Sequence, residues 1–158
     1  MMSLTLAVLV HASAAATGAD DYHAAKHRAE ASGQALVVLV GADWCPGCRT
    51  MKQSVIPQAK RQGMLKHVEF ATVNTDKQSA LAGKLMRGGS IPQLIMFRKT
   101  DKGWKRDQVI GAQSMDELAR FLEPAKALAA KPKADTSTAQ SEATSEKPEV
   151  HKTSTGGK

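Results

Sequence analysis

Hydrophobic residues in the middle of the chain fall into short runs separated by polar segments, and these runs predict strands. Residues 35–40 (ALVVLV) form an unbroken apolar run, which is typical of a strand covered on both faces. Residues 68–73 (VEFATV) predict a second buried strand, and residues 93–97 (QLIMF) predict a third. After a turn at residues 100–103 the chain returns as a fourth strand at 104–110, so the last two strands form a hairpin.

Helices are predicted around these strands by capping residues and by the positions of proline and glycine. Gly33 stops the first helix, and proline cannot continue regular helical hydrogen bonding, so the second helix should break or kink near Pro57. The predicted helices are residues 22–32, a helix that starts at Pro46 and reaches Pro57, residues 77–87, and a last helix that begins at the capping box Ser114-Met115-Asp116-Glu117 and runs through Leu122.

The order of these elements defines the expected fold class. Strands that alternate with helices favour a parallel core, and the final hairpin adds an antiparallel edge. We therefore expect an α/β protein, built as a three-layer α/β/α sandwich around a central mixed four-stranded sheet with a C-terminal β-hairpin.

Both ends of the chain differ in composition from this middle part. Residues 1–16 contain no Asp, Glu, Lys or Arg, and a short apolar stretch precedes the small-residue cleavage sites Ala12-Ser13-Ala14 and Ala14-Ala15-Ala16. These features predict a cleavable signal peptide, and hence a periplasmic or secreted protein. Residues 124–158 contain no aromatic residue and few large aliphatic ones, which predicts a disordered low-complexity tail. One domain, residues 20–123, lies between the two ends.

Charge and composition narrow the range of partners. The chain carries a formal charge of +7, from 22 Lys and Arg against 15 Asp and Glu, but the basic residues of the middle part are scattered among carboxylates. The chain has only two Trp, one Tyr and three Phe, too few for the stacking platforms that bind single-stranded nucleic acid. We therefore expect a solvated, mildly basic surface and no nucleic-acid partner. The N-terminal apolar stretch is shorter than a membrane span of about 20 residues, so we expect no stable membrane insertion after signal cleavage.

The two cysteines permit one redox pair and exclude both a disulfide-dense scaffold and an all-cysteine zinc site. Cys45 lies just before a helical turn, where free peptide N–H groups and the helix dipole favour a thiolate. Pro46 takes the position that needs no N–H, while Gly47 and Cys48 keep N–H groups that can point at the sulfur. Cys48 follows one turn later, close enough to attack a mixed disulfide on Cys45. Cys45 is thus the candidate nucleophile and Cys48 the candidate resolving thiol; a static disulfide and half of a metal site are the alternatives.

The segment Gly41-Ala42-Asp43-Trp44-Cys45-Pro46-Gly47-Cys48, at the end of a buried predicted strand, resembles the active site of the thioredoxin superfamily. The resemblance extends over about residues 35–122. Ile91-Pro92 is similar to the cis-proline loop of that family, which implies a cis bond at Pro92 and backbone groups of Ile91 that can pair with an extended substrate. Trp44 is expected to form an apolar shoulder beside the cysteines, with packing in the core as its alternative.

Two positions depart from the pattern of this family. Reducing thioredoxins typically carry a buried Asp six residues before the first cysteine and a Lys on the neighbouring strand, and together these groups move protons for the resolving thiol. Leu39 and Thr72 occupy the corresponding positions here. The dipeptide between the cysteines, Pro46-Gly47, also differs from those of general reductants and strong oxidants. The resemblance therefore implies thiol–disulfide exchange without its direction, and without the proton relay.

These observations predict a thioredoxin-like, exported thiol:disulfide oxidoreductase. Its expected partners are protein thiol or disulfide substrates and one unidentified redox partner, and we expect a monomer that needs no organic cofactor and no metal. A thioredoxin-fold binding or scaffold module with slow or no redox turnover is the main alternative. A dedicated metal-carrying site formed by the two thiolates is another.

Overall fold

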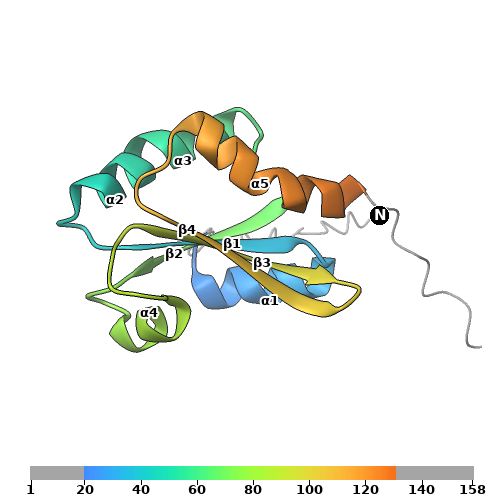
Figure 1. Ribbon diagram of the computed structural model, residues 1–158, viewed down its shortest axis with the longest axis horizontal. Helices are drawn as coiled ribbons and strands as arrows, with labels where there is room; N and C mark the ends of the chain where they lie inside the picture. Colours follow the sequence, from blue (N-terminus) through green and yellow to red (C-terminus); the bar gives the residue numbers. More distant parts are fainter. Residues whose placement is uncertain (1–19, 131–158) are drawn as a thin grey trace, which may run out of the picture.

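The computed structural model describes residues 20–130. The predicted signal peptide, residues 1–16, lies outside this range, as do residues 131–158 of the predicted tail. The elements follow in the order α1 (Tyr22–Ser32), β1 (Ala35–Gly41), α2 (Pro46–Thr50), a π-helical turn η1 (Met51–Val55), α3 (Ile56–Arg61), β2 (Val68–Asn74), α4 (Ser79–Leu85), β3 (Gln93–Thr100), β4 (Gly103–Ile110) and α5 (Met115–Ala130). Helices α1 and α4 cover one face of the sheet, and α2, α3 and α5 cover the other (Figure 1). The predicted three-layer α/β/α fold is confirmed.

β1 runs through the interior of the sheet and is buried along its whole length. Successive side chains of a strand point to opposite faces, so a strand covered on both sides must be apolar throughout. Val37 and Leu39 belong to the core beneath α3 and α5. Leu36, Val38 and Val40 belong to the core beneath α1 and α4. The unbroken apolar run therefore reflects two separate cores.

The sheet has the strand order β2-β1-β3-β4 in the described part of the chain. β1 and β2 are parallel, with Leu39 opposite Thr72. β3 is antiparallel to both β1 and β4, so the antiparallel part begins one strand earlier than the alternation of helices and strands suggested. The reason is the entry point of β3: its first residue, Gln93, pairs with Val40 at the carboxyl end of β1. The loop before β3 consequently lies at the end of the sheet where β1 finishes.

The ends of α1 agree with the sequence prediction, whereas α4 is shorter than predicted. Asp21 caps α1 by accepting a hydrogen bond from a backbone N–H of its first turn, and Gly33 closes the helix with φ of 74°. α4 begins only at Ser79, because the side chain of Asn74 accepts bonds from two backbone N–H groups and holds the preceding residues in a turn. It ends at Leu85, since the next residue is extended.

The helix that follows the cysteines changes its hydrogen bonding rather than stopping at Pro57. Pro57 has no N–H to donate, and the turn immediately before it, η1, is π-helical. The N–H of Ile56 bonds the carbonyl of Met51, five residues back. The predicted break is thus a widened turn, and the helix continues to Arg61.

The last helix extends past the predicted end of the domain. Its start is the expected capping box: Glu117 accepts from the backbone N–H of Ser114, and the N–H of Glu117 donates to the Ser114 hydroxyl. The helix continues past residue 123, the predicted end of the domain, and α5 runs through Pro124 to Ala130. Ala125 is 1% exposed and packs in the core, and the alanine-rich sequence beyond Pro124 favours the helix.

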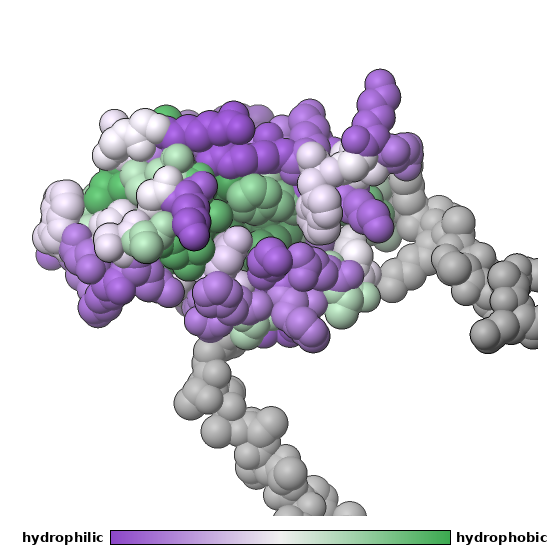
Figure 2. Space-filling view, turned by 90° about the horizontal axis from the view of Figure 1, so that it is seen from below, coloured by the Kyte–Doolittle hydropathy of each residue, from purple (hydrophilic) through white to green (hydrophobic). Residues whose placement is uncertain are grey.

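The face that carries α1 and α4 exposes a hydrophobic area among hydrophilic side chains (Figure 2). A depression of about 280 Å³ lies here, and Tyr22, Leu36, Phe97 and Trp104 contribute its apolar lining. Trp104 is 55% exposed. Among residues 20–130 no helix is both long and apolar enough to cross a membrane.

Candidate active site

Cys45 and Cys48 form a disulfide at the start of α2, directly after the central strand β1. Their Cα atoms are 5.2 Å apart. Cys45 is the N-cap residue of α2 and has extended backbone geometry, while Pro46 occupies the first helical turn. The predicted placement of the cysteine pair at a helix start is therefore found in the structure.

The sulfur of Cys45 lies beside the first turn of α2, where a backbone N–H group is directed at it. The backbone N–H of Cys48 donates to Cys45 Sγ over 3.2 Å. Such a bond, together with the helix dipole, stabilises negative charge on this sulfur when the disulfide is reduced. Cys45 is 6% exposed and Cys48 is 0% exposed. A disulfide or thiol of another molecule can thus reach Cys45, whereas Cys48 faces the interior.

Two glycines leave the space that this arrangement needs. A Cβ atom on Gly41 would lie 2.7 Å from Cys48 Sγ, so any larger residue at the end of β1 would displace the buried sulfur. A Cβ atom on Gly47 would meet the Pro92 ring at 3.3 Å. Gly47 is one of the predicted site residues. Gly41 is the first residue of the segment that resembles the thioredoxin active site, but it was not predicted as a site residue. Its position directly after the apolar run of residues 35–40 was the available signal.

The peptide bond between Ile91 and Pro92 is cis, as the resemblance implied. The loop that carries it faces the cysteines: the carbonyl oxygen of Ile91 lies 3.9 Å from Cys45 Sγ, and Ile91 packs against the cluster formed by Ala42, Cys45 and Cys48. This loop and the start of α2 are therefore the two walls of the site. The structure brings together all the predicted site residues, namely Trp44, Cys45, Pro46, Gly47, Cys48, Ile91 and Pro92.

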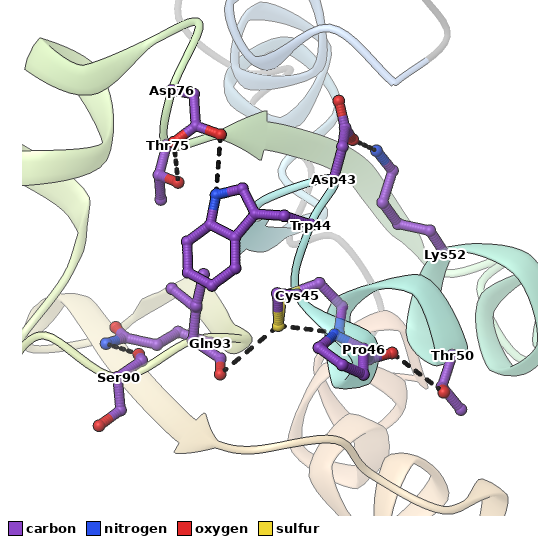
Figure 3. The surroundings of a disulfide bond; sticks show 12 residues. Asp43, Trp44, Cys45, Pro46, Thr50, Lys52, Thr75, Asp76, Ser90 and Gln93 are labelled. Carbon is purple, nitrogen blue, oxygen red and sulfur yellow. Dashed lines mark hydrogen bonds and ion pairs between the residues drawn. A yellow bond between two sulfur atoms is a disulfide. The ribbon is translucent and has the colours of Figure 1, made fainter.

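Gln93 holds this loop and was not identified from the sequence. Among the described residues it is the one polar side chain that is buried, with 0% exposure. Its Nε2 donates to the carbonyl of Ser90 over 2.8 Å, and its Oε1 accepts from the N–H of Arg87 and from Gln108 Nε2. Figure 3 shows the Ser90 contact to the left of Cys45. The signal in the sequence was a glutamine at the head of an otherwise apolar strand.

Trp44 is a surface residue, so the alternative of core packing is excluded. Its side chain is 66% exposed, and its indole N–H donates to Asp76 Oδ2 over 3.1 Å. The indole ring lies between Asp76 and Cys45 (Figure 3). Trp44 thus offers an exposed apolar surface beside the reactive sulfur, and Asp76, in the turn after β2, fixes its orientation.

Asp43 joins two lysines next to the motif. Lys52, on η1, lies 3.0 Å from one carboxylate oxygen, and Lys77, after β2, lies 3.3 Å from the other. The hydrogen bonds from Lys52 and then Lys77, together with their positive charges, lower the pKa of Asp43. Asp43 therefore remains a carboxylate at neutral pH and connects three segments around the site.

A small cavity of about 90 Å³ lies beneath the disulfide. Leu39, Thr72 and Cys48 are among the residues that line it. Leu39 and Thr72 are also paired in register on neighbouring strands, as expected for positions that correspond to the acid and lysine of reducing thioredoxins. Within residues 20–130, no three His, Cys, Asp or Glu side chains gather as a metal-binding group.

The chain belongs to a family of known proteins. The model of the family described as Thioredoxin-like matches residues 16–99, which is more than half of the 158 residues. The chain is similar to the thioredoxin of Fasciola hepatica, with 25% identity, a TM-score of 0.50, and coverage of 63% of this chain and 89% of that one. A thioredoxin from Thermus thermophilus matches with 22% identity and a TM-score of 0.53, covering 72% of this chain and 87% of that one. No curated protein matches.

Proposed function

We propose that this protein is an exported thiol:disulfide oxidoreductase that exchanges electrons with protein thiols through Cys45 and Cys48. One observation carries the proposal: the cysteines form a disulfide at a helix start, with the Cys48 N–H directed at Cys45 Sγ and the Ile91-Pro92 loop facing that sulfur. Membership of the Thioredoxin-like family supports it.

The chemistry is an exchange of disulfide bonds in two steps. The Cys45 thiolate attacks one sulfur of a substrate disulfide; a mixed disulfide forms, and the other substrate sulfur leaves as a thiolate that takes a proton from solvent. The Cys48 thiolate then attacks Cys45 Sγ and releases the first substrate sulfur, so that the internal disulfide forms. Two electrons pass from the cysteine pair to the substrate. The reverse sequence oxidises a substrate dithiol.

The surroundings of Cys45 favour an extended polypeptide as substrate. Residues 87–90, which lead to the cis-proline loop, are exposed, so a substrate backbone can lie along them. The exposed indole of Trp44 lies between Asp76 and Cys45 and provides an apolar contact (Figure 3). This arrangement supports protein substrates over small thiols.

Turnover of insulin disulfides tests this function. The reduced protein should precipitate insulin chains in the presence of dithiothreitol, and Cys45→Ser should abolish the reaction because it removes the attacking thiolate. Cys48→Ser should instead form a mixed disulfide that persists. Wild-type turnover no faster than that of Cys45→Ser would contradict the proposal.

Export is the second part of the proposal, and it rests on the composition of residues 1–16. A disulfide-forming pair is consistent with an oxidising compartment. Mass spectrometry of the protein recovered from the periplasm or medium should find an N-terminus between Ala15 and Ala19. An intact Met1 would contradict cleavage of a signal peptide.

One structural observation favours the alternative function, a binding module with little redox turnover. Leu39 and Thr72 line the cavity beside Cys48, and neither can accept a proton from its thiol. The insulin experiment separates the two functions, since a binding module would retain affinity for an extended peptide in the Cys45→Ser variant and show no turnover in the wild type.

A further inference from the structure

The second step of the exchange reaction requires the buried thiol of Cys48 to lose its proton. This inference rests on the proposed function, in which Cys48 attacks the mixed disulfide. The attacking species is the thiolate, but Cys48 is 0% exposed, and burial disfavours the charged form of a thiol. Something near Cys48 must therefore stabilise negative charge and let the proton leave.

The cavity beneath the disulfide supplies a polar surface next to Cys48. Its lining includes the side chains of Thr72, Asn74 and Gln78, from β2 and the turn that follows, and also Lys52 from η1. At about 90 Å³ it is large enough for water, which needs polar partners of this kind. The Lys52 side chain, which lines the cavity, is 41% exposed.

Lys52 is the one charged residue among those that line this cavity. Outside the lining, Lys52 and Lys77 share the carboxylate of Asp43, which gives these three side chains a sum of +1. β1 contributes Leu39 and Gly41, which carry no charge, and β2 contributes only uncharged side chains. Two further charges lie nearby but are directed elsewhere or exposed: Asp76 bonds the Trp44 indole, and Arg49 is on the exposed side of α2.

We propose that Lys52 is a positioning residue for the resolving step. Lys52 lines the cavity and its ammonium group bonds Asp43 Oδ1; its positive charge stabilises the Cys48 thiolate, while the thiol proton passes through the cavity to solvent. The Cys48 thiolate then attacks Cys45 Sγ, the Cys45–Cys48 bond forms, the mixed disulfide breaks, and the substrate sulfur leaves with its electron pair and takes a proton from solvent. Lys52, on η1 after the cysteine motif, thus assists the resolving step. In reducing thioredoxins an acid and a lysine do so, at the positions that Leu39 and Thr72 occupy here.

Lys52→Gln and Lys77→Gln form a matched pair of variants. Each removes one positive charge and one hydrogen bond from the same carboxylate, but only Lys52 lines the cavity. In a Cys45→Ser background, ultraviolet absorbance of the thiolate gives the pH midpoint at which Cys48 ionises. Lys52→Gln should raise this midpoint by about half to one pH unit, Lys77→Gln should leave it almost unchanged, and Lys52→Arg should restore it.

The rate of the resolving step is the second readout. Reduced protein with both cysteines is mixed with dithiobis-nitrobenzoate; attack by Cys45 releases one thionitrobenzoate, and attack by Cys48 releases the second. Lys52→Gln should slow the second release about three- to tenfold near neutral pH and spare the first. Equal effects of Lys52→Gln and Lys77→Gln, or none from either, would overturn the role of Lys52. Failure of the wild type to reduce insulin, with the Cys48 midpoint still shifted by Lys52→Gln, would instead refute the proposed function alone.

Discussion

At the scale of single residues, the two cysteines differ in their surroundings, and this difference predicts different reactivity. Cys45 Sγ receives the N–H of Cys48 at a helix start, whereas Cys48 is completely buried. After reduction, iodoacetamide near neutral pH should modify Cys48→Ser, which retains Cys45, at least about tenfold faster than Cys45→Ser. Mass spectrometry of the two variants over time measures both rates. Faster modification of Cys45→Ser would reverse the roles assigned to the cysteines.

Gln93 predicts a second effect at this scale. Replacing it with Leu would leave the carbonyl of Ser90 and the N–H of Arg87 without their side-chain partner in the loop before the cis-proline bond. We expect a loss of about 1–3 kcal/mol in the free energy of unfolding, measured with urea. Gln53→Leu, on the exposed side of η1, is the control and should cost less than about 0.5 kcal/mol. Equal losses in both variants would show that the hydrogen bonds of Gln93 do not hold the loop.

The same residues show how far the sequence predicts the site. The cysteines could be identified because their chemistry is local, a pair at a predicted helix start, whereas Trp44 and Pro92 were identified through the resemblance to the thioredoxin superfamily. Gln93 and Gly41 could not, because their importance depends on what the fold places against them, the loop at residues 87–90 and the sulfur of Cys48. The available signals were a glutamine at the start of an otherwise apolar strand and a glycine directly after an apolar run.

At the scale of secondary-structure elements, the capping box of α5 predicts a pH-dependent contribution to stability. The backbone N–H of Ser114, followed by its hydroxyl, donates to Glu117 and lowers the pKa of that carboxyl group. A lowered pKa means that the carboxylate stabilises the fold above the pKa of the unfolded chain, and that this contribution disappears as the pH falls through the folded value. The difference in unfolding free energy between wild type and Glu117→Gln should therefore shrink on acidification.

Urea unfolding at a series of pH values measures this difference. In a Ser114→Ala background the effect of Glu117→Gln should be smaller at every pH above the transition, because the hydroxyl donor is missing. A difference that stays constant across the acidic range would contradict the stabilising role of the Glu117 carboxylate.

Element boundaries were predicted less well than element types, for identifiable reasons. Pro57 is accommodated by a π-helical turn, since a helix can widen before a proline when its neighbours remain packed. α5 continues past Pro124 because Ala125 fills a place in the core. In both cases tertiary packing outweighs the local preference of proline, and no local pattern reports that packing.

At the scale of the whole molecule, the site forms where three segments meet at one end of the sheet. The start of α2 follows β1, the turn with Asp76 follows β2, and the cis-proline loop leads into β3 at the same end (Figure 1). The fold class could be predicted because alternating helices and strands leave few arrangements. The direction of β3 could not be predicted, because the direction depends on where the loop before β3 enters the sheet.

A redox titration of the cysteine pair tests the central claim most directly. The full chain is equilibrated with glutathione buffers of increasing ratio of reduced to oxidised form, and free thiols are trapped by acid and counted by mass spectrometry. We predict one two-electron transition in which Cys45 and Cys48 change together, approached equally from the oxidised and the reduced protein, with no such transition in Cys45→Ser. A disulfide that does not exchange with any buffer would show that the Cys45–Cys48 bond is only structural.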